Sequence, residues 1–572
     1  MFTEALRKEL ETLFIEKKYE EVIKISEKEL TTQEIPASLS NLTGICKILK
    51  KKRTIEDVSS ALSYFEGAYL KGKNTIHGMN GLTHLISIGL QFLKGNIQLK
   101  PFIIRAKKFY LEAENHFKKN EVFLSSGLLL YSHFLDFEKQ KQISNKILNG
   151  ASQSKYLRSK CLFEKNYFRD WLQKDHFENA IINSKHFNKL NVKEIKEINY
   201  EKNKKINIGF VSSDFEKNHS ITFFLKDIIK HLDKKKFKIS LFSLAKKNIE
   251  DESQNELRSL ADEWFDCEKF DNQELLNLIQ EERIYILFDV MGFTNPYRLE
   301  IFKSRISPIQ VSWLAYCNTV GFEAIDYIIA DHNLILKDEE KLYIEKIIRL
   351  PNIWSTHSGF SFKREFLDQP YEREKIFTFG SFNNFKKISD ETVEVWSSIL
   401  QNVSNSRLIL KSSTFCDVDI LLKKFEKNGV RNKIEIFEKE NFLKKKDHLD
   451  LYKKIDLALD TFPYNGVTTT FEALWMGVPT IVLKGYNFNS RCGESIIKNT
   501  GIDYLVATSS KDYIQKATLL SQDKKKLNKI RKLLFDQVLT TPLFNTQDFA
   551  KDFGELFFKI FNNKSINKNL II

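Results

Sequence analysis

Two patterns of hydrophobic and polar positions divide the chain near residue 190. In the first part, apolar residues recur three or four positions apart, as on one face of an amphipathic helix. The first set is Leu6, Leu10, Leu13, Phe14, Tyr19, Val22 and Ile23. Similar sets follow at 58–65 and 106–113. The pattern predicts an α-helical domain over residues 1–192.

The helical part has features of a repeat. The stretch from Lys18 to Ile25 resembles one helix of a tetratricopeptide repeat. The apolar sets, however, lie about 45 residues apart, whereas that repeat has a period of about 34. Two alternatives stay open, a solenoid-like domain of degenerate repeats and a plain helical bundle.

A polar stretch at 193–205 predicts a linker, and short β-rich runs follow it. Runs at 206–211, 238–244, 284–290 and 309–313 alternate with helical stretches. The pattern restarts at 377–380, 407–410, 433–437, 457–459 and 480–483. Such alternation is typical of parallel α/β sheets. It predicts two Rossmann-like halves, 206–372 and 373–545, with a ligand cleft between them, then a C-terminal helix and tail at 546–572.

The charge and the spacing of the cysteines limit the partners and the location that we expect for the protein. Lys and Arg number 89 against 75 Asp and Glu, a net charge of +14, but the basic runs are short, scattered and interleaved with acids. This favours a solvated surface over a nucleic-acid footprint. The six cysteines are widely spaced, and no apolar run reaches the length of a membrane span. We expect a cytoplasmic protein without nucleic-acid partner or membrane insertion.

Common cofactor and metal motifs do not account for the chain. Neither half contains the glycine-rich phosphate loop of nicotinamide enzymes or of P-loop NTPases. Asp417 and Asp419 form a D-x-D pair, the acidic motif of metal-dependent sugar transferases. The pair opens a helical run, where Asp is common in the first turn, so we predict a capping role and no metal site.

The densest cluster of candidate functional residues follows Asp460. A strand ends there, Gly466 predicts a tight loop, and a helix begins at Thr468. Free N–H groups at a helix N-terminus, with the hydroxyls of Thr468 and Thr469, suit a phosphate. Glu472, one turn further, could accept hydrogen bonds from ribose hydroxyls. The alternative is a helix that is merely capped.

Motifs in a fixed order extend this site over the whole α/β part. They are Gly209–Phe215 with His219, Gly292–Thr294 with Arg298, Pro308–Gln310, Trp313–Leu314, Asp326–Tyr327, Phe382–Asn384 with Lys387, His448, the loop with Thr468 and Glu472, Ser490–Arg491 and Pro542–Asn545. Together they resemble the catalytic region of the O-linked N-acetylglucosamine transferase and SPINDLY family, over residues 205–560. The resemblance implies a type B glycosyltransferase fold, in which two Rossmann-like domains face each other, preceded by degenerate tetratricopeptide-like helices.

The resemblance also implies roles for single residues. His219 would line the sugar and acceptor side, and Lys387 would contact the donor diphosphate; these two are the expected catalytic residues. The expected donor-binding residues are Asn384, Lys445, His448, Thr468, Thr469 and Glu472. Lys445 and His448 would flank the base, the two threonines would bind phosphate, and Glu472 the ribose. Alternatively, His448 is an exposed capping residue and His219 a loop histidine bonded to the backbone.

Three departures from the family pattern affect the sugar pocket and the general base. Ala315, Tyr316 and Cys317 stand where members often have Gly-Tyr-Pro, and Phe293 stands where many have His. Tyr285 occupies a position where some members have a histidine discussed as the base. A tyrosine, with an ordinary pKa of about 10, is a poor base at neutral pH. The identity of the base stays open.

The resemblance predicts an inverting, metal-independent enzyme without cofactor. It would move N-acetylglucosamine from UDP-GlcNAc to Ser and Thr hydroxyls of a protein acceptor engaged by the helical domain. One alternative keeps the fold but uses GDP-fucose or another nucleotide hexose, as the SPINDLY branch suggests. Another is a non-catalytic helical-repeat scaffold with a degenerate transferase module. The joint presence of His219, Lys387, His448, Thr468 and Glu472 argues against the scaffold.

Overall fold

The computed structural model describes residues 4–30, 36–93, 96–192, 205–216, 219–360, 362–366, 368–411, 416–437 and 445–566. The chain divides into two compact units, residues 1–157 with 415–420 and residues 158–414 with 421–572. The predicted linker at 193–205 lies, except for residue 205, outside the described residues.

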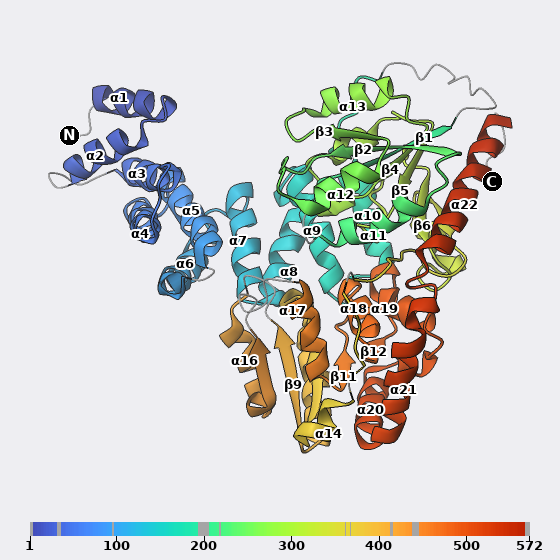
Figure 1. Cartoon of the computed structure of the whole chain (residues 1–572). Helices are drawn as coiled ribbons and strands as arrows, with labels where there is room; N and C mark the ends of the chain where they lie inside the picture. Colours follow the sequence, from blue (N-terminus) through green and yellow to red (C-terminus); the bar gives the residue numbers. More distant parts are fainter. Residues whose placement is uncertain are drawn as a thin grey trace. The chain divides into compact units, whose positions relative to one another are not determined.

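The first unit is built of helices packed in chain order (Figure 1). They are α1 (Glu4–Ile15), α2 (Tyr19–Leu30), α3 (Ala37–Leu49), α4 (Ile55–Lys71), α5 (Ile76–Leu93), α6 (Lys100–Ala113), α7 (Glu121–His133) and α8 (Phe137–Lys146). The first apolar set is divided between α1 and α2, because the chain turns at Lys17, where φ is 60°. Leu10 and Val22 still meet in one core with Leu39. The predicted all-α region is confirmed.

The first half of the second unit is a seven-stranded parallel sheet. Its strands are β1 (Ile206–Ser212), β2 (Phe237–Ser243), β3 (Glu263–Asp266), β4 (Ile286–Asp289), β5 (Ile309–Ser312), β6 (Tyr327–Ala330) and β7 (Lys346–Arg349). They lie in the order β3-β2-β1-β4-β5-β6-β7, with Ile208 of β1 opposite Ile286 of β4. The helices α11 (Ser220–His231), α12 (Glu252–Leu260) and α13 (Asn272–Glu281) connect the first strands.

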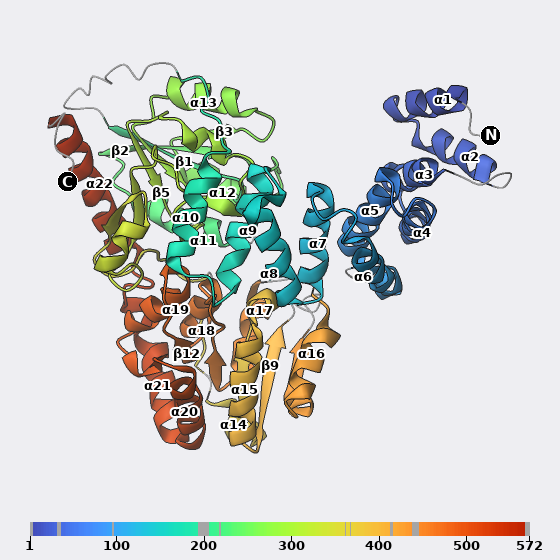
Figure 2. The same ribbon diagram turned by 180° about the vertical axis from the view of Figure 1, so that it is seen from behind.

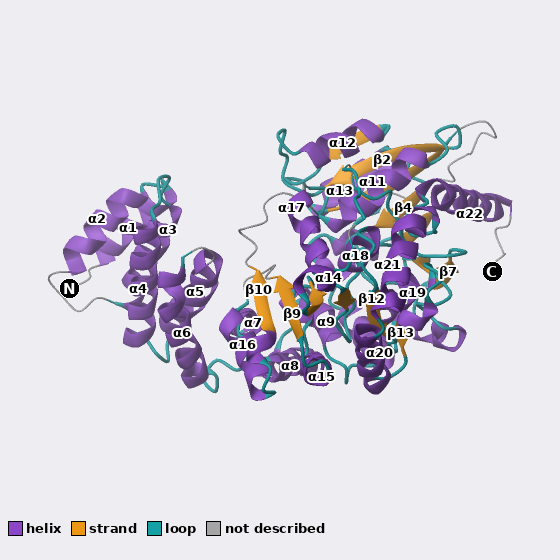
Figure 3. Ribbon diagram, turned by 60° about the horizontal axis from the view of Figure 1, so that its bottom comes forward, coloured by secondary structure: helices purple, strands orange, loops and turns teal. Residues whose placement is uncertain are grey.

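The second half repeats this topology in a six-stranded parallel sheet, shown between its flanking helices in Figure 3. Its strands are β8 (Phe377–Ser381), β9 (Ser406–Lys411), β10 (Ile434–Phe437), β11 (Leu457–Leu459), β12 (Thr480–Leu483) and β13 (Val506–Ala507), in the order β10-β9-β8-β11-β12-β13. Its helices are α14 (Pro370–Glu374), α15 (Asp390–Asn402), α16 (Val418–Lys427), α17 (Lys445–Asp450), α18 (Thr468–Trp475), α19 (Phe488–Lys498), α20 (Ser510–Gln522) and α21 (Lys524–Gln537). The prediction of two Rossmann-like halves is confirmed.

Strand order locates the crevice in each half. The first strand of each sheet has neighbours on both sides, β2 and β4 for β1, and β9 and β11 for β8. The chain therefore adds strands first on one side of β1 or β8 and then on the other side. The switch lies between β1 and β4 in the first sheet and between β8 and β11 in the second. In open parallel sheets, ligands bind outside the carboxyl ends of the strands at such switch points. The loops after β1, β4, β8 and β11 are thus where chemistry is expected.

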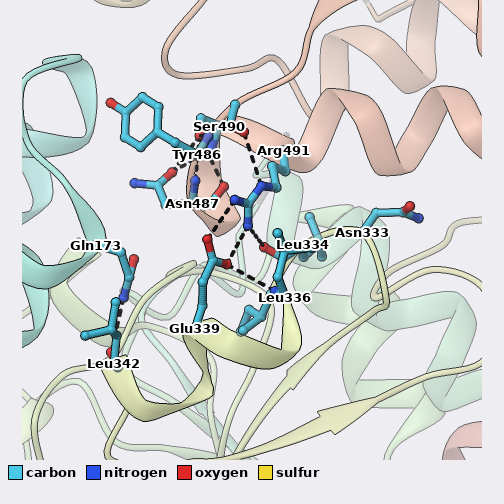
Figure 4. Close-up of polar contacts among 12 residues, drawn as sticks. Gln173, Asn333, Leu334, Leu336, Glu339, Leu342, Tyr486, Asn487, Ser490 and Arg491 are labelled. Carbon is cyan, nitrogen blue, oxygen red and sulfur yellow. Dashed lines mark hydrogen bonds and ion pairs between the residues drawn. The ribbon is translucent and has the colours of Figure 1, made fainter. Parts of the chain in front are cut away.

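Two helices make contacts that join the halves. The last helix, α22 (Thr546–Ile566), returns to the first sheet, where Phe553 and Phe557 pack on Phe288. Arg491 of α19 forms a two-pronged ion pair with Glu339 of the 3₁₀ helix Lys337–Leu342, with N–O distances of 2.6 and 2.7 Å (Figure 4). Arg491 also donates to the Leu334 carbonyl at 3.2 Å. The motif residue Arg491 is therefore a link between the two sheets.

The compact first unit ends earlier than the predicted helical domain. We expected that domain to reach residue 192, but residues from 158 onward belong to the second unit. They include most of α9 (Lys155–Glu164) and all of α10 (Gln173–Ser184) (Figure 2). The Gln173 side chain donates to Asn318 at 2.8 Å, and the Leu190 amide donates to Ser304 at 2.8 Å. Polar contacts with the loops of the first sheet thus hold this stretch to the second unit.

Four strands were not predicted from the sequence, β3, β6, β7 and β13. β3 and β7 are edge strands with charged ends, and β13 has only two residues, so their apolar runs are too short to stand out. β6 has only four residues, although three of them are buried.

Candidate active site

The predicted site residues lie after the carboxyl ends of strands, on the connecting loops or on the helices that follow them. His219 follows β1, and Asn384 and Lys387 follow β8. Thr468, Thr469 and Glu472 belong to α18, which follows β11. Lys445 and His448 lie on α17, between β10 and β11. Parallel pairing therefore gathers segments that are far apart in the sequence.

Glu472 is the centre of a buried polar cluster. Its side chain is 2% exposed. One carboxylate oxygen pairs with Lys445, and the other accepts hydrogen bonds from His448 Nε2 at 2.9 Å and Tyr452 Oη at 3.1 Å. Burial raises the pKa of the Glu472 carboxyl, but the Lys445 charge and the contact with His448 outweigh it and hold the pKa well below its usual value. Glu472 is therefore a carboxylate at neutral pH.

A second lysine fixes the tautomer of His448. The Lys411 ammonium, at the carboxyl end of β9, lies 2.8 Å from His448 Nδ1. An ammonium group can only donate, so Nδ1 accepts and Nε2 carries the proton that faces Glu472. His448 is part of this network; it is not the exposed capping residue of the alternative interpretation.

The start of α18 leaves donors available for an anion. Its N-cap, Val467, provides no side-chain acceptor. Among the described contacts, the N–H groups of Val467, Thr468 and Thr469 have no acceptor. The Thr469 hydroxyl donates to Asn383 Oδ1 at 2.8 Å. N–H groups at a helix N-terminus form a ready anion site.

Lys387 lies beside this helix start. Its Nζ donates to the Asn465 carbonyl at 2.8 Å and lies 4.2 Å from the centre of the Tyr464 ring. Burial lowers the pKa of Lys387 to about 8, against the attraction of Asp460. The ammonium form still predominates at pH 7, and its bond to Asn465 holds the cation against the loop that leads to the N–H groups of α18. Asn384 accepts from the Lys386 amide at 3.1 Å and thereby caps the short helix Phe385–Lys387.

His219 is the N-cap of α11. Its Nδ1 accepts from the Ile221 amide at 3.4 Å, and its Nε2 lies 3.8 Å from Asp214. This backbone contact is the one that the alternative interpretation describes. The Nδ1 lone pair is engaged here, so His219 would have to release the amide before accepting a proton at Nδ1. Its catalytic role stays a prediction.

Side chains of α11 nevertheless reach the second half. The Lys445 ammonium lies 5.1 Å from the centre of the Phe223 ring, and Phe224 packs edge-on against Phe471 of α18 at 5.2 Å. Phe223 is one turn from His219. The loop after β1 therefore borders the same region as the Glu472 cluster.

Tyr285 lies away from this region. It precedes β4, at the amino end of the strand, and its ring packs edge-on against Phe561 of α22 at 4.4 Å. Burial raises its pKa further. Tyr285 is therefore not part of the site described here. Phe293 does follow β4; it is buried and packs against Tyr316 at 5.1 Å.

The D-x-D pair has partners of its own. Asp417 accepts from the Asp419 amide at 3.1 Å at the start of α16, as a capping residue does. Lys100, which belongs to the same compact unit, binds both carboxylates. Among the described residues, no group of three or more His, Cys, Asp and Glu could hold a metal ion. No described helix is both long and apolar enough to cross a membrane.

Sequence reasoning missed several members of the site. Lys411 and Tyr452 complete the Glu472 cluster, and Asn383 and Asp460 join the loops after β8 and β11 through a hydrogen bond of 3.1 Å. One signal was available: each of Asn383, Lys411 and Asp460 stands at or just after the carboxyl end of a buried strand. No local signal marks Tyr452.

Comparisons with known proteins agree with this geometry. The model of a family described as glycosyl transferase family 41 matches residues 168–358 and 368–553. Among curated proteins, a probable UDP-N-acetylglucosamine–peptide N-acetylglucosaminyltransferase SPINDLY of Arabidopsis thaliana is 32% identical over 351 residues, which cover 60% of this chain and 38% of that protein. The corresponding SEC protein of the same plant is 28% identical over 63% of this chain and 37% of its own length. The chain thus spans less than two-fifths of these relatives.

A solved structure extends the similarity to almost the whole chain. A variant of the O-GlcNAc transferase of Thermobaculum terrenum superposes with a TM-score of 0.77 and 22% identity, covering 92% of this chain and 98% of that one. This likeness shows the fold, including the helices before the two sheets, and confirms the predicted architecture.

Proposed function

The chain belongs to glycosyl transferase family 41, and on this basis we propose that it transfers N-acetylglucosamine from UDP-GlcNAc to Ser and Thr hydroxyls of proteins. The glycosyltransferase class is confirmed by family membership. The donor, the acceptor and the mechanism are our proposals. The observation that carries them is a cation, Lys387, beside the free N–H groups of α18, within the same domain as a buried carboxylate, Glu472.

The proposed donor site has three parts. Lys387 and the start of α18 would bind the diphosphate. Glu472 would bind the ribose hydroxyls, with Lys445 and His448 beside the base. As the glycosidic bond breaks, charge grows on the leaving diphosphate, and a fixed cation with oriented N–H groups stabilises that charge. Attack by the acceptor oxygen from the opposite face would invert the anomeric centre.

We propose that this chemistry needs no divalent cation. The support is positive: the charge of Lys387 and the helix N-terminus supply what a metal would otherwise provide to the diphosphate. The expected result is full turnover in excess chelator. Activity that disappears in chelator and returns with Mn²⁺ would contradict the proposal.

The decisive experiment is a nucleotide screen on the purified full chain. UDP at about 100 times its Kd should raise the free energy of unfolding by about 2.7 kcal/mol, a shift that thermal melting detects. UDP-GlcNAc should then be hydrolysed or its sugar transferred to protein. Stabilisation by GDP with hydrolysis of GDP-fucose would favour the alternative donor, and no effect of any nucleotide would favour the non-catalytic scaffold.

The proposed partner of the first unit is the protein acceptor. Its helices carry exposed apolar residues such as Ile97, Ile104 and Leu111, which recur every seven positions on η1 (Ile97–Leu99) and α6. None of the residues assigned to the donor lies in this unit. We therefore expect it to affect transfer to protein more than donor hydrolysis.

A further inference from the structure

Asp460 is a buried carboxyl to which the proposed reaction assigns no role. It follows β11 and is 1% exposed. Its Oδ1 accepts three hydrogen bonds, from the Gly466 amide at 2.8 Å, the Thr461 amide at 2.9 Å and Asn383 Nδ2 at 3.1 Å. One oxygen therefore draws together the two ends of the loop between β11 and α18.

Asn383 carries this arrangement to the helix. Its Oδ1 accepts from the Thr469 hydroxyl at 2.8 Å, so a chain of hydrogen bonds runs from Asp460 through Asn383 to the first turn of α18. The approach at Gly466 is close, since a Cβ there would lie 2.4 Å from Asn383 Oδ1 and 2.2 Å from the Thr469 hydroxyl. The loop can take this course only with glycine at 466.

The N–H groups of this loop therefore fall into two sets, one that is bonded inside the loop and one that is left free. Gly466 N–H points inward to Asp460, whereas the next three, of Val467, Thr468 and Thr469, have no acceptor among the described contacts. On the same loop, the Asn465 carbonyl holds Lys387 Nζ at 2.8 Å. Asp460 thus supports the loop that bears the free N–H groups and the carbonyl that holds Lys387.

A carboxylate this close to a diphosphate would ordinarily repel it. Burial raises the pKa of Asp460 to about 7, against the lowering effects of the Gly466 hydrogen bond and of Lys387. A large share of the molecules therefore carry a neutral carboxyl at pH 7. In its protonated form the carboxyl still accepts hydrogen bonds at one oxygen, so Asp460 can shape the loop without opposing the ligand.

We propose that Asp460 is a positioning residue for the donor diphosphate: it holds the loop of residues 461–467, through Gly466 and Asn383, in the form that leaves the first N–H groups of α18 free. The inference rests on the proposed function. It predicts an effect on binding of the phosphates and none on binding of the nucleoside.

The test compares Asp460→Ala with Asp456→Ala in the full chain. Asp456 is a matched control because it is also buried, precedes the same strand, and accepts from two amides, Tyr371 at 3.1 Å and Thr378 at 2.8 Å. Titration calorimetry would measure binding of UDP and of uridine. We expect Asp460→Ala, which removes the acceptor oxygen, to raise the Kd for UDP about tenfold or more and to leave that for uridine within about twofold. Asp456→Ala should lower the melting temperature but change neither Kd.

Asn383→Ser provides a second variant if Asp460→Ala does not fold. It removes the bridge to Thr469 but leaves Asp460 in place, and it should also weaken UDP and not uridine. Unchanged UDP binding in the folded variants, or an equal loss for UDP and uridine, would overturn the inference. Should the wild-type chain bind neither UDP nor GDP, the proposed function itself would fail, and this inference with it.

Discussion

Lys387 lies between a backbone carbonyl and an aromatic ring, the Asn465 oxygen at 2.8 Å and the Tyr464 ring at 4.2 Å. Both contacts hold the ammonium at the loop that leads into α18. A cation fixed in this way stabilises the diphosphate most when the leaving-group charge is largest, in the transition state. Its effect should therefore appear in turnover more than in folding stability.

The first prediction is that Lys387→Met lowers turnover of UDP-GlcNAc roughly a hundredfold or more, by analogy with loss of one oxyanion-hole donor. Methionine keeps a stem of similar length and removes the charge. Lys386→Met is the control, since Lys386 precedes it on the same short helix. Steady-state kinetics with melting temperatures would check the result. Near-normal turnover in both variants would refute the diphosphate role.

Glu345 is a buried carboxyl whose pKa is shifted upward, whereas the pKa of Glu472 is shifted downward. It is 2% exposed, and its Oε2 has no partner among the described contacts. Burial raises the pKa of Glu345 to about 7, against hydrogen bonds from Thr319 and Val320. The folded state therefore binds a proton more tightly than the unfolded chain, whose ordinary value is 4.5.

The second prediction concerns this proton. Glu345 contributes stability that is fully present below about pH 4.5 and is lost as pH rises through about 7. Glu345→Gln should remove that dependence and raise the free energy of unfolding at pH 8 by a few kcal/mol, on the order of two pKa units. Urea denaturation at pH 5 and pH 8 would measure it. The exposed Glu394→Gln serves as control; equal pH dependence of the wild type and Glu345→Gln would contradict the assignment.

At the scale of elements, α19 is one of the helices that link the halves. Arg491 is 5% exposed and reaches Glu339, the Leu334 carbonyl and the Gly485 carbonyl (Figure 4). Neighbouring bonds act in the same direction: the Ser495 hydroxyl donates to Asp331 at 2.6 Å. A short stretch of α19 therefore supplies several of the polar bonds between the two halves.

The third prediction is that Arg491→Met lowers both stability and catalysis. Breaking a buried ion pair leaves Glu339 without its guanidinium and costs about 3 kcal/mol. Because the diphosphate groups and His219 lie on different halves, kcat/KM should fall as well. Arg349→Met is the matched control: it breaks a pair with Glu340 on the same 3₁₀ helix, at 2.6 Å, but within the first half. Equal effects of both variants on kcat/KM would refute a linking role.

The sequence predicted the elements with strong local signals. Nine strands stood out as apolar runs, and the ends of β8 and β11 marked Lys387 and Thr468, because a polar residue after a buried strand is a local feature. The partners of those residues depend on pairing between distant strands. Asp460 meets Asn383 across 77 residues, and Lys411 reaches His448 across 37. No pattern in a single segment contains that information.

For the whole molecule, the boundary between the two units decides what a truncation removes. Residues 158–190 belong to the second unit and carry contacts to both of its halves. Gln173 bonds Asn318 of the first half, and the Phe168 carbonyl accepts from Tyr486 of the second at 3.2 Å. Tyr167 stacks on Tyr464 with ring centres 5.0 Å apart, beside the carbonyl that holds Lys387.

The last prediction compares two truncations. Removal of residues 1–157 should leave UDP-GlcNAc hydrolysis within about twofold of the full chain, because none of the proposed donor groups is lost. Removal of residues 1–190 deletes the Tyr167 stack and several buried hydrogen bonds, each contributing about 1 kcal/mol, so it should lower the melting temperature and hydrolysis together. Both truncations should lose transfer of labelled sugar to protein. Full transfer after removal of 1–157 would refute an acceptor role for the first unit, and equal stability of the two truncations would refute the assignment of residues 158–190 to the catalytic part.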